Sequence, residues 1–164
     1  MEGETVEVVF NVLVKSAEQS ILTPGYYLIC HAGTGRLLTG HASGELVSFE
    51  KGDVNKPEAH QIWKINNSSV RHSMTVVADS LPLFANGKLG SASLYSFYFE
   101  QAAGTERYAI RTGLTEATKK YWDMNADGSV NTELREFPGY PFLIIPIEPA
   151  LGVGETEHFA SFVG

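Results

Sequence analysis

The sequence predicts an all-β domain made of three similar four-stranded units. Glycine and proline, at 16 and 7 residues, are spread along the chain and separate short segments rich in Val, Ile, Leu, Tyr and Phe, as is typical of strands and turns. No window of about 12 residues places apolar side chains at helical spacing between suitable caps. Bulky apolar segments also recur at intervals of about 40 residues, which fits a repeat of four strands.

The first unit opens with the aromatic pair Tyr26-Tyr27 and closes with Ile62-Trp63. Between them, glycines at 33, 35 and 44 mark the turns. We therefore expect its strands at 26–30, 36–39, 45–49 and 62–65.

The second and third units repeat this arrangement. The second opens with Met74-Thr75-Val76 and closes with Tyr98-Phe99, and the third opens with Tyr108-Ala109-Ile110 and closes with Phe142-Leu143. Their predicted strands are 73–77, 83–85, 88–89 and 94–100, then 108–112, 120–124, 129–134 and 142–147. Three such units would bury one shared core, and a barrel capped by a layer of hairpins would leave few free sheet edges.

Three segments of the first unit carry a family resemblance. They are Thr23-Pro24-Gly25-Tyr26-Tyr27-Leu28-Ile29, Gly33-Thr34-Gly35-Arg36-Leu37-Leu38 and Gln61-Ile62-Trp63-Lys64-Ile65. They resemble the first repeat of fungal β-trefoil proteins, a group that includes the ricin B-like mushroom lectins and two kinds of mushroom protease inhibitor, the mycocypins and the cospin-type inhibitors. The triplet Gln61-Ile62-Trp63 matches the QxW signature of the ricin B-like group.

The resemblance implies a β-trefoil, a six-stranded barrel with a hairpin cap, over residues 21–148. Residues 1–20 are then an N-terminal extension, in which 6–14 form a probable extra strand, and residues 149–164 are a C-terminal tail. The resemblance also implies a role in fungal defence.

The composition excludes some classes of partner. Twelve Lys and Arg against nineteen Asp and Glu give a net charge of -7, a poor match to nucleic acid or anionic membrane. The single cysteine, Cys30, allows no intramolecular disulfide and is expected to be a small buried hydrophobe. With no apolar stretch approaching 18 residues and no signal-like start, we expect a cytoplasmic protein that is a monomer or a weak dimer.

The sequence contains none of the catalytic motifs of hydrolases, nucleotide-binding proteins or metalloproteases, so no enzyme and no cofactor are expected. His31, His41 and His60 have no zinc-like spacing. Residues 123–128 match the first half of an EF-hand loop, but Leu134 stands where the bidentate Glu is required. Asp127-Gly128 is interpreted as a two-residue hairpin turn, and no metal site is expected.

The preferred function is protease inhibition through an exposed loop. Residues 132–140 precede the last strand and are stiffened by proline, which lowers the entropy lost on docking. The candidate inhibitory residues are Leu134, Arg135, Glu136 and Phe137, with Arg135 suited to a trypsin-type pocket. A plain surface pair of Arg135 with Glu133 or Glu136 is the alternative. The partner would be a serine or cysteine protease.

The alternative function is a ricin B-like lectin. Aromatic faces can stack on sugar rings while carboxylate and amide groups bond to hydroxyls. The candidates are Gln61, Trp63, Trp122, Asp123 and Asn125. Because Tyr121 and Trp122 are adjacent on a strand, at most one could reach a sugar, and a core position for either is the competing interpretation. A third option is an interaction module that uses the N-terminal strand.

Overall fold

The structure is a computed structural model that describes residues 19–92 and 94–148. The predicted strand at 6–14 lies outside these residues. The described elements are β1 (Gln19–Ser20), β2 (Gly25–His31), β3 (Leu37–Thr39), β4 (Ser48–Glu50), the 3-10 turn η1 (Ala59–Gln61), β5 (Trp63–Ser68), β6 (Arg71–Val76), β7 (Leu81–Pro82), β8 (Phe97–Gln101), β9 (Arg107–Thr112), β10 (Lys120–Met124), β11 (Val130–Leu134) and β12 (Phe142–Ile147).

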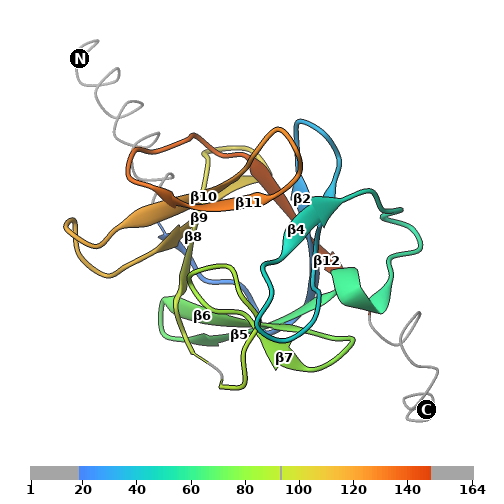
Figure 1. Ribbon diagram of the computed structural model, residues 1–164. Coiled ribbons are helices and arrows are strands. Elements are labelled where there is room, and N and C mark those ends of the chain that lie inside the picture. Colours follow the sequence, from blue (N-terminus) through green and yellow to red (C-terminus); the bar gives the residue numbers. More distant parts are fainter. Residues whose placement is uncertain (1–18, 93, 149–164) are drawn as a thin grey trace.

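Six strands pair in a closed antiparallel ring. β2 pairs with β5, β5 with β6, β6 with β8, β8 with β9, β9 with β12, and β12 returns to β2. Figure 1 shows the three units around one centre, the first running from blue to green, the second from green to yellow and the third from orange to red. Closure leaves the barrel without free edges along most of its length.

The remaining strands other than β1 form the cap. β3 pairs with β4 and β10 with β11, whereas the second unit closes through β7 and a single bridge between Leu83 and Leu89. Two further bridges, Leu46 to Lys88 and Ser48 to Ser129, join the cap across units. A six-stranded barrel under three hairpins is the β-trefoil that the sequence predicts.

The second unit departs from the prediction in its hairpin. Residues 88–89 form only isolated bridges, and the strand expected at 83–85 lies earlier, at β7. The reason is the tight turn in which the Gly87 amide donates to the Phe84 carbonyl at 2.9 Å, with Gly87 at φ 86°. This turn takes up residues that a longer hairpin would need.

The third-unit hairpin turn is longer than predicted. The Asn125 amide donates to the Ser129 carbonyl at 2.8 Å, and the Gly128 amide donates back to the Asn125 carbonyl at 2.9 Å. This arrangement, with Gly128 at φ 92°, is a three-residue loop with a bulge and not the two-residue turn expected at Asp127-Gly128.

The core lies inside the barrel and under the cap. Its largest fully buried side chains are Trp63, Trp122, Phe49, Phe97, Phe99 and Phe142, contributed by all three units. Cys30 is buried beside Leu28, Leu37 and Ile62, in agreement with the role expected for it. Burial raises the pKa of the Cys30 thiol, so it stays protonated and unreactive.

The N-terminal residues of the described chain close a gap in the barrel wall. β6 and β8 share only the pair His72 and Phe97, and β1 pairs with β8 through Gln19 and Ser20. The Leu22 amide donates to Nε2 of fully buried His72 at 3.0 Å, so the ring proton sits on Nδ1, which faces the Phe97 carbonyl at 3.3 Å. Burial lowers the pKa of His72, partly offset by this second contact.

Candidate functional site

The aromatic residues of the predicted sugar site are part of the core. Trp63 and Trp122 both have zero exposure. The Trp63 indole donates to the Leu38 carbonyl at 3.0 Å, and Trp122 packs edge-on against Phe97 with ring centroids 5.3 Å apart. Because neither indole has a solvent-facing surface, their assignment to sugar stacking is wrong, and the core interpretation of Trp122 holds.

Gln61 is also structural. It is 4% exposed, and its amide nitrogen donates to Thr39 Oγ1 at 3.2 Å and to the Lys51 carbonyl at 3.1 Å. The first residue of the QxW triplet therefore joins the end of the first unit to that unit's own hairpin through hydrogen bonds. Its assignment to sugar binding is wrong as well, since the amide already serves buried partners.

Asp123 and Asn125 lie near the third-unit hairpin turn, away from any exposed indole. Asp123 accepts a hydrogen bond from the Met124 amide at 2.7 Å and lies 3.7 Å from His31 Nε2, while Asn125 Nδ2 donates to Ser129 Oγ at 2.9 Å. These contacts fix the turn. The buried indole of Trp122 gives them no aromatic face, and their own assignment to sugar binding stays a prediction.

The predicted inhibitory loop does connect the last two strands. Residues 135–141 run between β11 and β12, with Gly139 at φ 88°. Two contacts hold the far end: Arg107 Nε donates to the Tyr140 carbonyl at 2.8 Å, and the Ala32 amide donates to the Pro141 carbonyl at 2.9 Å. The loop is thus tied to the first strand of its own unit and to the first unit.

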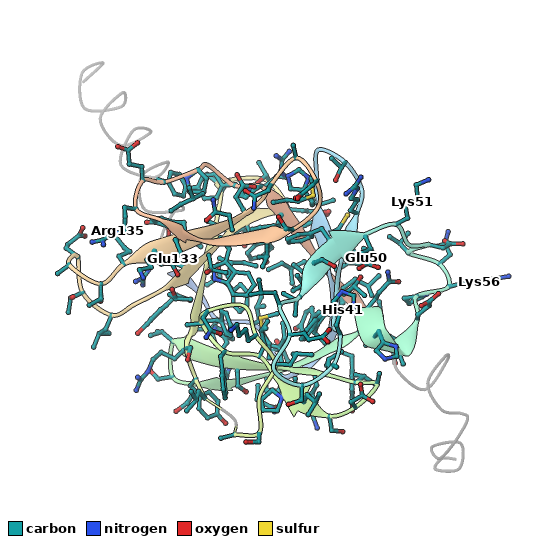
Figure 2. The ribbon with its side chains drawn as sticks, viewed as in Figure 1. His41, Glu50, Lys51, Lys56, Glu133 and Arg135 are labelled. Carbon is teal, nitrogen blue, oxygen red and sulfur yellow. The ribbon has the colours of Figure 1, made fainter. Side chains whose placement is uncertain are left out.

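Arg135 is held against its own chain. Its Nη2 donates to the Ala117 carbonyl at 2.7 Å, so it pairs with neither Glu133 nor Glu136. Glu133 instead accepts from Lys120 Nζ at 2.6 Å. Figure 2 shows Arg135 and Glu133 on the third unit. A guanidinium committed in this way is poorly placed to enter a protease pocket.

Phe137 is the most exposed apolar side chain of this loop. It is 46% exposed and contacts the rings of Tyr121 and Tyr140, with centroids 5.3 and 4.9 Å away. Leu134 is partly buried, since it pairs with Tyr121 across the hairpin, and Glu136 is exposed. Of the four predicted inhibitory residues, Phe137 is therefore the exposed apolar one, and Arg135 and Glu136 are exposed beside it.

A hollow that the sequence did not predict lies between the second and third units. Its volume is about 400 Å³, within the range of small-ligand sites. We call it the Tyr95 hollow, after a tyrosine that is 41% exposed at its rim. Its lining comes from the start of β6, the turn after β7, the segment before β8, and the residues around β9, β10 and β11, namely Arg71, Ala85, Asn86, Tyr95, Ser96, Tyr98, Thr112, Gly113, Leu114, Thr118, Lys120 and Glu133.

The floor of the Tyr95 hollow is braced by Arg111. Its Nε donates to Glu100 Oε2 at 3.0 Å, its Nη1 donates to the Gly113 carbonyl at 2.6 Å, and its Cζ lies 4.0 Å from the centroid of the Tyr98 ring. Arg111 is 6% exposed and Tyr98 3%. This network fixes Tyr98 and the start of the loop after β9, which form one side of the hollow.

Charged groups line the hollow unevenly. Lys120 and Glu133 form an ion pair, which lowers the pKa of the Glu133 carboxyl and keeps it ionised. Arg71 is exposed at the first position of β6. None of the ion pairs among the described residues includes Arg71, so its charge is not offset by a protein carboxylate there.

A second hollow, of about 500 Å³, lies on the first unit. Here His41 Nε2 lies 3.0 Å from Glu50 Oε2, and His60 Nε2 lies 3.7 Å from Asp79 Oδ2 (Figure 2 labels the first pair).

Among the described residues, no group of three or more His, Cys, Asp or Glu side chains could hold a metal ion. In the same part of the chain, no helix is long and apolar enough to cross a membrane.

Comparisons with known proteins found a similarity among solved structures only. No family model matches the chain, and no curated protein matches it. Among solved structures, the chain is similar to the Macrolepiota procera ricin B-like lectin in complex with lactose, with 12% identity and a TM-score of 0.48, over 79% of this chain and 91% of the lectin.

The Tyr95 hollow left no local pattern in the sequence, because its lining comes from segments far apart in the chain. The available signal was weak: a tyrosine at position 95, between Leu94 and Ser96, near the start of a predicted strand.

Proposed function

We propose that the protein is a carbohydrate-binding β-trefoil and that it binds sugar in the Tyr95 hollow. One observation carries the proposal: a half-exposed tyrosine ring stands at the rim of a braced hollow that also presents hydroxyl, amide and charged groups. A sugar offers a C–H face to an aromatic ring and hydroxyls to polar side chains. Asn86, Ser96 and Thr118 supply neutral polar groups beside Tyr95.

The test is binding to an array of glycans, followed by calorimetry on the best ligand. Tyr95→Ala is expected to weaken binding about fivefold or more, since an aromatic contact of this kind contributes about 1 kcal/mol or more. Phe137→Ala is the matched control, because it removes an aromatic side chain of similar exposure outside the hollow. Equal effects of the two variants, or no glycan bound at all, would contradict the proposal.

Protease inhibition stays as a second candidate, on the observation that Phe137 is exposed on a loop tied at its far end. Since Arg135 is engaged with the Ala117 carbonyl, the target would be a chymotrypsin-like enzyme and not a trypsin-like one. The same two variants separate this function from the first: titration of chymotrypsin should lose its inhibition with Phe137→Ala and keep it with Tyr95→Ala. Absence of inhibition by the unaltered protein removes this candidate.

A further inference from the structure

Arg71 gives the Tyr95 hollow a charge that is opposite to that of the whole protein. The chain carries a net charge of -7, yet the charged residues lining the hollow are Arg71, Lys120 and Glu133. Lys120 and Glu133 neutralise each other through a contact of 2.6 Å. The hollow is left with the single positive charge of Arg71.

The neighbouring surface does not compensate this charge. An adjoining hollow shares Leu114 and contains two more cations, Arg111 and Lys119. Arg111 is paired with Glu100 at 3.0 Å and Lys119 with Glu116 at 2.9 Å. Of the cations lining the two hollows in the described part of the chain, Arg71 is thus the one without an ion-pair partner.

The geometry of the guanidinium indicates which anion it would receive. A planar guanidinium presents parallel N–H donors that match the two oxygens of a carboxylate. Because the second cation of this hollow is already neutralised, a single guanidinium is available, which matches one singly charged carboxylate. We infer that the Tyr95 hollow binds an acidic glycan, with the sugar ring against Tyr95 and its carboxylate on Arg71. This inference rests on the proposed function and specifies its ligand class.

The experiment compares each acidic sugar with a neutral partner of the same ring. Glucuronic, galacturonic and sialic acid glycosides are measured beside their methyl esters, and 6-sulfated galactose forms a separate arm. The unaltered protein is expected to bind one of the acids at least tenfold tighter than its ester, because a charge-assisted hydrogen bond is lost on esterification. The preference should shrink as salt is raised, since the contact lies at the surface.

Arg71→Gln is expected to remove the preference, so that the acid and its ester bind with similar affinity. Lys56→Gln is the matched control: it removes one positive charge from an exposed position outside the hollow and should preserve the preference. Arg71 is itself exposed, so its substitution should leave folding intact, which a melting curve checks.

The outcomes separate the inference from the proposed function. Equal binding of acid and ester, with Tyr95→Ala still harmful, overturns the inference and leaves the function standing. A preference that survives Arg71→Gln, or a sulfated sugar that binds more tightly than any carboxylate, also overturns it. If no sugar of any class binds, both fail.

Discussion

Two buried tryptophans allow one hydrogen bond to be tested by a matched pair of substitutions. Both Trp63 and Trp122 have zero exposure, but only the Trp63 indole has a partner, the Leu38 carbonyl at 3.0 Å. The Trp122 indole nitrogen has no partner among the described residues. Replacing each by phenylalanine removes a similar volume and, in one case only, a hydrogen bond.

The expected costs follow from these environments. The lost packing costs about 2 kcal/mol in both variants, less than the range for complete truncation of a buried Trp. Trp63→Phe adds about 1 to 3 kcal/mol, because the Leu38 carbonyl loses a buried partner. Trp122→Phe instead removes an unpaired buried donor, whose desolvation cost of about 1 to 3 kcal/mol is recovered. Trp63→Phe should therefore be the more destabilising by at least about 2 kcal/mol.

Urea unfolding followed by circular dichroism measures this difference, and it avoids fluorescence, which both substitutions change. Equal free energies of unfolding, or a greater loss for Trp122→Phe, would refute the reasoning. Either result would mean that the QxW tryptophan contributes to this fold by volume alone.

The remaining predictions concern buried charge and backbone strain. Burial lowers the pKa of His72, so its neutral form stabilises the fold above about pH 6.5, and this stabilisation is lost as pH falls through the lowered pKa. Melting curves measured against pH should therefore show that acid lowers the melting temperature of His72→Gln less than that of the unaltered protein. Gly113→Ala should cost well over the ~1 kcal/mol expected for Gly139→Ala, since both residues have positive φ but the added carbon would overlap the Thr118 carbonyl at Gly113 and meets open space at Gly139. Similar melting temperatures of the two variants would argue against this. Arg111→Met should destabilise the fold by about 3 kcal/mol, because Glu100 is left unpaired in a partly buried site. The double variant Arg111→Met with Glu100→Gln should recover part of that loss. An unchanged free energy of unfolding in the single variant would show that the pair contributes nothing.

The strands that the sequence predicted best are those whose pattern is decided locally. The bounds expected for β10 and β12 match the structure, because each is a dense aromatic or β-branched segment bounded by turns or proline. The hairpin of the second unit could not be predicted in the same way, since its length depends on how the turn ending at Gly87 packs beneath the other two hairpins.

The burial of neighbouring side chains shows why the site was harder to predict. Tyr121 and Trp122 are adjacent on β10, so a local pattern requires one to face outward. Both are buried, because Trp122 enters the core and the outward-facing Tyr121 is covered by the loop that carries Phe137. A sequence shows which residues alternate along a strand. It does not show which distant segment packs over the outward-facing side chains, because that depends on tertiary contacts.

The short strand β1 has a consequence for any engineered form of this protein. It lies where the barrel wall is joined by one residue pair, and Leu22 anchors it to His72. The domain is therefore sealed by residues that precede its first barrel strand. A shortened chain should begin no later than residue 19, and one that starts at Gly25 should be less stable although every barrel strand is present.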